Sequence, residues 1–323
     1  DADTGEELLT LKGHKGWVTS AAYSPDGKRI VTASYDQTAK VWDANTGKEL
    51  FTLKGHERQL NSAIYSAGGD RIVTASFDKT AKVWDAQTGQ ELMTLKGHED
   101  WVYSAAYSPD DRIVTGSGDK TAKVWDAITG KELLTLTGHE GEVHSAAYSA
   151  DGQRIVTGSF DKTAKVWDAQ TGKELMTLKG HGSRVQSAAY SADGDRIVTA
   201  SGDAKVWDAQ SGKELMTLIG RDSWVASAAW SPNGQRIVTA GGDDVRIHGI
   251  QFTIEDFSDA QVLAREGAVI DALAKADQFA ALTGVTLGSL QFITESGGGQ
   301  PAVSNLRIRW KNRLFFMINT ECF

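Results

Sequence analysis

One pattern dominates this chain: a segment that opens with Gly-His and closes with Trp-Asp recurs five times in close register. The interval between openings is 42 residues, and it shortens to 41 and 40 where deletions occur. The openings stand at Gly13-His14, Gly55-His56, Gly97-His98, Gly138-His139 and Gly180-His181, followed by a degenerate sixth at Gly220-Arg221. Self-similarity at this period is typical of radial or solenoidal arrays. Such an array works through the surface it presents, so we expect a binding platform.

Each unit predicts four short strands. Residues 29–34 are rich in β-branched side chains and nearly continuous in apolar character, as expected of a strand covered on both faces. Pro25-Asp26-Gly27 precedes it as a turn, because Pro restricts φ and Gly accepts a positive φ. In the first unit the strands are predicted at residues 18–24, 29–34, 39–43 and 49–53. A single sheet exposes apolar faces on both sides, so neighbouring units must cover them, and a ring does this while leaving only short edges.

Composition narrows the class of partner. The net charge is −8 and no basic stripe is present, which argues against nucleic-acid binding. No apolar run approaches the roughly 20 residues that span a bilayer, so no membrane partner is expected. The single cysteine, Cys322, excludes an intrachain disulfide and fits a reducing compartment, which favours the cytoplasm. The chain opens at Asp1 in mid-repeat, which leaves room for an upstream segment.

These motifs make residues 1–248 resemble the WD-repeat β-propeller family. Gly-His, Ser-Pro-Asp-Gly, a Ser-x-Asp-x-Thr turn and Trp-Asp recur in register. The resemblance implies an all-β propeller of six sequence repeats, whose ring is closed when the N-terminal strand at residues 6–11 joins the last blade. Because the family usually has seven blades, two alternatives stay open: a six-bladed ring, or a seventh blade supplied by the C-terminal region.

The family's blades contain a hydrogen-bonded tetrad of His, Thr, Asp and Trp, and each full repeat matches it. Although the tetrads look like catalytic triads, a set that recurs in every blade is expected to be a buried structural network. We therefore predict no enzyme activity, no cofactor and no metal site. The resemblance assigns these tetrads to His14, Thr32, Asp36 and Trp42; His56, Thr74, Asp78 and Trp84; His98, Thr115, Asp119 and Trp125; His139, Thr157, Asp161 and Trp167; and His181, Thr199, Asp203 and Trp207.

The sixth unit departs from this pattern. Arg221 replaces the His, and His248 stands where the Trp belongs. A full tetrad cannot form there, so this blade is expected to be the weakest or to be specialised for contact with the C-terminal segment.

The composition changes after residue 248, and residues 249–323 predict a small α/β segment. A helix is expected at about 259–282, and strands at about 250–254, 286–294, 303–310 and 314–320. Residues 249–301 resemble the later half of bacterial SIMPL-type domains, on the motifs QFTIEDF, ALTGVTLGSL and ITESGGGQP. A truncated domain of this kind would expose a sheet edge, so it is expected to dock on the propeller or to self-associate. The alternative is that its strands join residues 6–11 as a seventh blade.

A few positions differ from repeat to repeat although the scaffold positions are almost copies. They stand after each Gly-His and before each turn Asp, and in the WD-repeat family these loops lie on the usual partner-binding face. They include residue types that are enriched at interface hot spots. The alternative is drift after duplication, with some aromatic side chains packing on the next blade. The predicted face consists of Trp17, Thr19, Tyr35, Arg58, Gln59, Asn61, Phe77, Trp101, Tyr103, Glu142, His144, Phe160, Arg184, Gln186 and Trp224.

The sequence therefore predicts a non-enzymatic scaffold that binds a protein or peptide partner on one face. The alternative is a sensor or regulatory module of a larger bacterial protein whose effector domain lies outside this chain.

Overall fold

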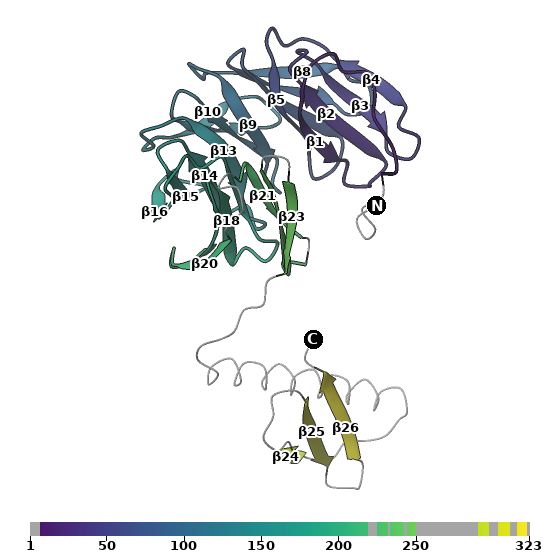
Figure 1. The fold of residues 1–323 in the computed structure, drawn as a ribbon, viewed down its shortest axis with the longest axis vertical. Coiled ribbons are helices and arrows are strands. Elements are labelled where there is room, and N and C mark those ends of the chain that lie inside the picture. Colours follow the sequence, from purple (N-terminus) through teal and green to yellow (C-terminus); the bar gives the residue numbers. More distant parts are fainter. Residues whose placement is uncertain are drawn as a thin grey trace. The chain divides into compact units, whose positions relative to one another are not determined.

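The computed structural model describes residues 7–218, 225–231, 233–241, 244–249, 290–296, 303–310 and 315–321. The chain divides into two compact units, Asp1–Ile250 and Gln251–Phe323 (Figure 1). Throughout the described residues the regular elements are all strands. The first unit is thus an all-β array of repeats, as the sequence predicts.

Five of the sheets in the first unit have four antiparallel strands each, paired in chain order. The first contains β1 (Val18–Tyr23), β2 (Arg29–Ser34), β3 (Ala39–Asp43) and β4 (Glu49–Leu53). The second contains β5 (Leu60–Tyr65), β6 (Arg71–Ser76), β7 (Thr80–Asp85) and β8 (Glu91–Lys96). The third contains β9 (Val102–Tyr107), β10 (Arg112–Ser117), β11 (Ala122–Asp126) and β12 (Glu132–Leu136).

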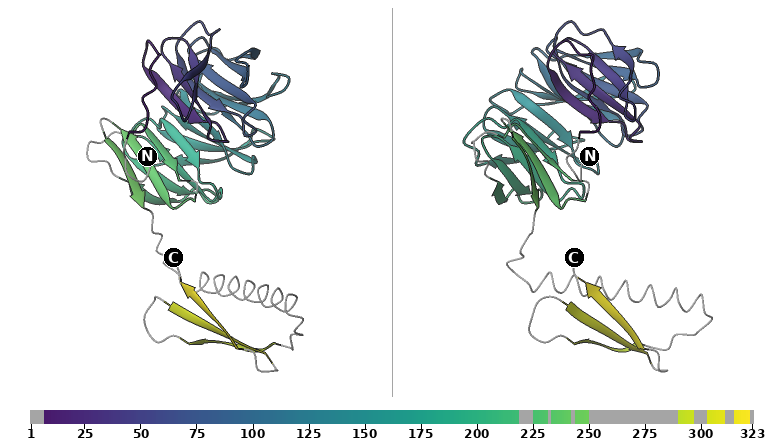
Figure 2. Two further views of the ribbon diagram at one scale, coloured as in Figure 1. Left: turned by 90° about the vertical axis from the view of Figure 1, so that its right-hand side faces the viewer. Right: turned by 45° about the vertical axis from the view of Figure 1, so that its right-hand side comes forward.

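The fourth sheet contains β13 (Val143–Tyr148), β14 (Arg154–Ser159), β15 (Thr163–Asp168) and β16 (Glu174–Lys179). The fifth contains β17 (Ser187–Tyr190), β18 (Arg196–Ala200), β19 (Ala204–Asp208) and β20 (Glu214–Leu218). The last sheet has three described strands, β21 (Ser227–Trp230), β22 (Arg236–Gly241) and β23 (Asp244–Gly249). Figure 2 shows these six sheets following one another in chain order.

Short polar side chains set the turns between the strands. The carboxylate of Asp43 accepts hydrogen bonds from the backbone amides of Asn45 and Thr46 and from the Thr46 hydroxyl. This arrangement closes a tight turn, and Gly47 follows with φ of 69°, a conformation that glycine adopts without strain. The same Asp-x-x-Thr/Ser-Gly turn begins at the Asp of each of the five Trp-Asp pairs, so the third strand of each full repeat reverses at the same point.

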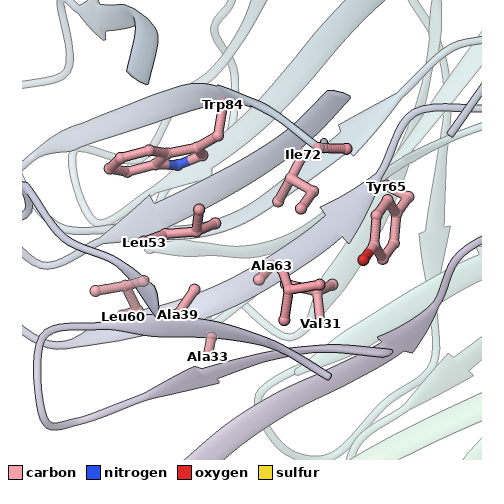
Figure 3. Close-up of a cluster of buried hydrophobic side chains, with 11 residues drawn as sticks. Val31, Ala33, Ala39, Leu53, Leu60, Ala63, Tyr65, Ile72 and Trp84 are labelled. Atoms are coloured by element: carbon pink, nitrogen blue, oxygen red, sulfur yellow. The ribbon is translucent and has the colours of Figure 1, made fainter. Parts of the chain in front are cut away.

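Adjacent sheets pack through two distinct faces. We call the face directed toward the next sheet the forward face, which in the first sheet carries Val31, Ala33 and Val41. The face directed toward the preceding sheet is the rear face, which in the second sheet carries Leu60, Ala63, Tyr65, Ile72 and Trp84. Figure 3 shows these two sets of side chains meeting in one buried cluster.

A polar contact accompanies each of the four junctions between the first five sheets. Arg29 Nη1 donates to the carbonyl of Ala86 at 2.6 Å, reaching from the first sheet to the residue after the second Trp-Asp. The same bond recurs from Arg71, Arg112 and Arg154 to the following sheet, at 2.6–2.8 Å. The junctions are therefore copies of one another in both their apolar and their polar contacts.

The structure corrects the predicted closure of the ring. The described residues from 7 to 17 form no strand, and the last sheet shows no fourth strand paired with them. Instead, a Cβ placed on Gly47 would lie 3.5 Å from Leu11 and 3.8 Å from Leu9. Phe51 and Leu53 hold the corresponding positions beside Gly89. The N-terminal segment therefore packs against the first sheet as the fourth strand of a preceding sheet would, without joining β23.

The second unit contains one described sheet, with β24 (Leu290–Ser296), β25 (Val303–Trp310) and β26 (Phe315–Glu321) in that order. These strands overlap the three predicted at about 286–294, 303–310 and 314–320. The predicted helix and the predicted strand at 250–254 lie outside the described residues. The domain boundary at residue 248 and self-association through this segment stay predictions.

Candidate interaction surface

Five sets of four side chains link the strands of the first five sheets. In each set, His Nδ1 lies 2.7–2.8 Å from the Asp carboxylate and His Nε2 lies 2.6–2.8 Å from the Thr hydroxyl. The indole N–H of the Trp donates to the same hydroxyl at 2.7–2.8 Å. These are the residues predicted as tetrads. The counterparts Arg221 and His248 of the sixth repeat lie where no side chain is described.

The first tetrad shows how the four side chains bond to one another. Burial raises the pKa of Asp36, but hydrogen bonds from Thr38, the Lys15 amide and His14 outweigh it and hold the pKa at about 2. The carboxylate is therefore ionised and accepts a hydrogen bond from Nδ1–H. Nε2 bonds to the Thr32 hydroxyl, which accepts from the indole of Trp42. The Thr hydroxyls are buried, with at most 4% of each residue exposed, and each also bonds to a Trp indole, so they link the strands of their sheets.

The strand order brings two families of loops to one end of the sheets. In an antiparallel meander, the loop before the first strand and the turn between the second and third strands lie at the same end. Backbone bonds join them directly: the amides of Tyr35, Phe77, Gly118 and Phe160 donate to carbonyls of Trp17, Gln59, Trp101 and Glu142, at 2.8–3.0 Å. The varied positions that the sequence singled out are thus neighbours within each sheet.

Rings at these positions also contact one another between sheets. Trp17 stacks on Tyr35 with ring centroids 5.9 Å apart, and Tyr35 lies 5.9 Å from Phe77 of the next sheet. Phe77 stacks on Trp101 at 4.6 Å and meets Tyr103 edge-on at 5.6 Å. We call this continuous set the aromatic row. Its members are Trp17, Tyr35, Phe77, Trp101, Tyr103, His144 and Phe160.

The far end of the aromatic row is tightly packed. The imidazole of His144 lies between the rings of Tyr103 and Phe160, at centroid distances of 3.7 and 3.8 Å. Burial lowers the pKa of His144 to about 4, against the opposing effect of Glu142. The guanidinium of Arg184 covers the outer side of Phe160, 4.4 Å from the ring centroid. The row therefore spans four repeats and ends against a cation from the fifth.

Hydrogen bonds fix residues of the aromatic row and of the loops next to it. The hydroxyl of Tyr103 donates to Glu142 at 2.7 Å, which fixes its ring against the fourth sheet. Asn61 Nδ2 donates to the backbone carbonyl of Tyr103 at 2.7 Å, and Thr19 Oγ1 donates to the carbonyl of Leu60 at 2.9 Å. These polar side chains serve the junctions between sheets.

The exposed fraction of each side chain distinguishes residues that support the aromatic row from residues that a partner could contact. Tyr103 is only 7% exposed, whereas Trp17 and Trp101 are 80% and 39% exposed. Tyr35, Phe77, His144 and Phe160 are half-buried. Arg58 is exposed beside the row, while Gln59 and Gln186 are half-buried, and Trp224 lies outside the described residues. The two tryptophans are thus the large apolar groups that the row offers to a partner.

One contact on this surface escaped the sequence analysis. Lys79 Nζ donates to the carbonyl of Glu99 at 2.7 Å, which ties the turn of the second sheet to the loop of the third. The position of Lys79 in the sequence could have indicated this contact, because Lys79 stands two residues after Phe77 in the same turn.

Within the described residues, no group of three or more His, Cys, Asp or Glu side chains is placed to hold a metal ion. In the same part of the chain, no helix has the length and apolar character needed to cross a membrane.

Comparison with known proteins finds two families. The WD domain, G-beta repeat family matches residues 5–43, 47–85, 89–126, 130–168, 172–208 and 212–247. SIMPL, described as a protein of unknown function (DUF541), matches residues 233–309. The second match begins inside the sixth repeat and extends beyond the 249–301 stretch on which the sequence resemblance rests.

Several curated proteins are similar to a single repeat of the chain. Nuclear distribution protein PAC1 of Arthroderma benhamiae is 46% identical over 43 residues, which are 13% of this chain and 9% of that protein. WD repeat-containing protein 1 of Gallus gallus is 41% identical over 46 residues, 13% and 8% of the two chains. Lissencephaly-1 homolog 1 of Paramecium tetraurelia is 41% identical over 39 residues, 12% and 10%. The matched segments thus span a tenth or less of these relatives.

Proposed function

We propose that this chain, which belongs to the WD domain, G-beta repeat family, is a non-enzymatic scaffold that binds a protein or peptide partner through its aromatic row. The observation that carries the proposal is the pair of exposed indoles, Trp17 and Trp101, on a rigid row of stacked rings. Large aromatic side chains held in place lose little conformational entropy on binding, and they dominate the energetics of many interfaces.

The repeats themselves support this choice of surface. The opposite end of the sheets carries the turn Asp-x-x-Thr/Ser-Gly, which is nearly the same in each of the first five repeats. The loop end carries positions whose residues vary among the repeats, and these residues still form one connected set of contacts. A partner that recognises this end would read residues from several repeats at once.

The proposal extends to the class of partner. A surface of aromatic rings flanked by Arg58 and Arg184 suits a polypeptide that presents apolar side chains together with acidic or carbonyl groups. The overall charge of −8 makes nucleic acid an unsuitable partner.

The test compares two alanine substitutions at exposed apolar residues on opposite ends of the sheets. Immobilised wild-type protein, the Trp17→Ala/Trp101→Ala variant and the Ile128→Ala variant are each incubated with host extract, and captured proteins are quantified by mass spectrometry. Ile128 is 62% exposed in the turn after β11, at the end of the sheets away from the aromatic row. We expect a partner to be lost from the tryptophan variant and retained by Ile128→Ala, with unchanged melting temperatures. Equal capture by all three proteins would refute the assignment.

A further inference from the structure

The aromatic row offers hydrogen-bond donors as well as apolar surface. The five tetrad indoles all donate to Thr hydroxyls, at 2.7–2.8 Å. By contrast, the indole N–H groups of Trp17 and Trp101 and the hydroxyl of Tyr35 make no hydrogen bond within the described residues. Both of these tryptophans are exposed. A partner of the row therefore meets ring faces together with donors that still need an acceptor.

The rings follow one another at similar intervals. The centroids of Trp17, Tyr35, Phe77 and Trp101 are 5.9, 5.9 and 4.6 Å apart in that order. A polyproline II helix rises about 3.1 Å per residue, so about two of its residues cover each interval. A segment of about six residues is thus long enough to pass all four rings.

The hydrogen bonds of the loops bear on which kind of peptide suits the row. The amide of Tyr35 donates to the Trp17 carbonyl at 2.9 Å, and the amide of Gly118 donates to the Trp101 carbonyl at 2.8 Å. A peptide strand pairs with a free edge of backbone groups, and these groups are already paired with each other. A helical peptide could match the spacing of the rings, but its carbonyls accept bonds inside the helix and leave the indole donors unsatisfied.

A polyproline II segment suits both the rings and the donors. It has no internal hydrogen bonds, so its carbonyls are free to accept from indole N–H groups. Its proline rings pack on aromatic side chains, and φ is fixed before binding, so little conformational entropy is lost. We propose that the aromatic row binds a proline-rich peptide segment in the polyproline II conformation. This inference rests on the proposed function, because it names the partner of the same surface.

Charge at the far end of the row adds one feature to this segment. The guanidinium of Arg184 lies against Phe160 and makes no ion pair within the part of the chain that the structure describes. The nearby carboxylate of Glu142 is engaged instead by the Tyr103 hydroxyl and by His144. An acidic residue at one end of the proline-rich segment pairs with Arg184, because a guanidinium binds a carboxylate through parallel N–H donors.

The test measures the binding of fluorescein-labelled peptides to the whole chain by fluorescence anisotropy. Three peptides of about twelve residues, long enough to pass the four rings, have capped ends and an aspartate at each end. The first alternates proline with alanine, the second forms an amphipathic helix with leucines on one face, and the third alternates valine with threonine. We expect the proline-rich peptide to bind with a Kd below about 1 mM, roughly tenfold or more tighter than the other two.

Substitutions test the rings, the donors and the cation separately. Trp17→Ala/Trp101→Ala should weaken binding of the proline-rich peptide by roughly tenfold or more. Trp17→Phe/Trp101→Phe keeps the rings and removes both N–H donors, so binding should weaken by roughly threefold or more. Arg184→Gln should weaken the peptide with terminal aspartates by roughly threefold or more and leave the same peptide with terminal asparagines unchanged. Ile128→Ala is the control that should bind as the wild type does, and melting temperatures show that each variant is folded.

The possible failures have different meanings. Tighter binding of the helical or the strand peptide, lost in the alanine variant, would overturn the polyproline II segment and leave the aromatic row as the binding surface. Binding of none of the peptides would overturn the inference, while the comparison of captured proteins still decides the proposed function. Equal binding of the proline-rich peptide by the wild type and the alanine variant would place its site elsewhere. Unchanged binding by the phenylalanine variant would show that the donors are not used, which removes the reason for preferring this conformation.

Discussion

The hydrogen bonds within the tetrads make one substitution especially informative. Thr115 is fully buried and links two groups, because its hydroxyl accepts from the Trp125 indole at 2.8 Å and bonds to His98 Nε2 at 2.8 Å. Thr115→Val keeps the shape of the side chain and removes the hydroxyl. Both the indole N–H and the imidazole nitrogen then lose their partner inside the third sheet.

Each unsatisfied buried group costs about 1–3 kcal/mol, so Thr115→Val should reduce the free energy of unfolding by about 2–5 kcal/mol. Thr115→Ser is the matched control, because it keeps the hydroxyl and removes one buried methyl group, at a cost of about 1 kcal/mol. Urea unfolding at neutral pH, followed by tryptophan fluorescence, measures both. If Thr115→Val is as stable as Thr115→Ser, the hydroxyl is not the link that the geometry indicates.

Three further predictions concern the junctions, the aromatic row and the turns. Val102→Ala should lower the free energy of unfolding by about 1–2.5 kcal/mol, because Val102 is buried. Val18→Ala should lower it by less than about 0.5 kcal/mol, because Val18 is exposed, and urea titrations measure the difference. Since the folded protein holds the pKa of His144 near 4 and the unfolded chain has its ordinary value of 6.5, stability should fall as pH decreases from about 6.5 to 4. In the His144→Phe variant, the loss of stability over this pH range should be smaller by up to about 3 kcal/mol. A variant whose melting temperature depends on pH as that of the wild type does would contradict this. Gly89→Ala should destabilise by more than about 1 kcal/mol, because φ is 73° and a Cβ would lie 2.8 Å from Phe51; a melting temperature equal to wild type would rule out this strain.

Much of the first unit follows from short stretches of sequence. The strand at residues 29–34 and the turn at Asp43 depend on neighbours within a few positions, so their residue types are sufficient to predict them. The positions of the proposed interaction surface also stand out in the sequence, because their residues vary among otherwise nearly identical repeats. Burial within that surface could not be predicted. Tyr103 and Trp101 are two residues apart and both aromatic, yet one is buried beneath His144 and the other is exposed.

The sequence alone determined the repeat, the four-strand pattern of each full unit and the residues of the five tetrads, because each depends on contacts within one unit or its copy. Only the tertiary structure decided whether the row of sheets closes. Val18 and Val102 stand at the same position of the repeat, and the exposed fraction of the first arises from the relative orientation of six successive sheets. Whether the row of sheets closes depends on the summed rotation of each sheet relative to the next. This sum cannot be predicted from a local pattern of residues.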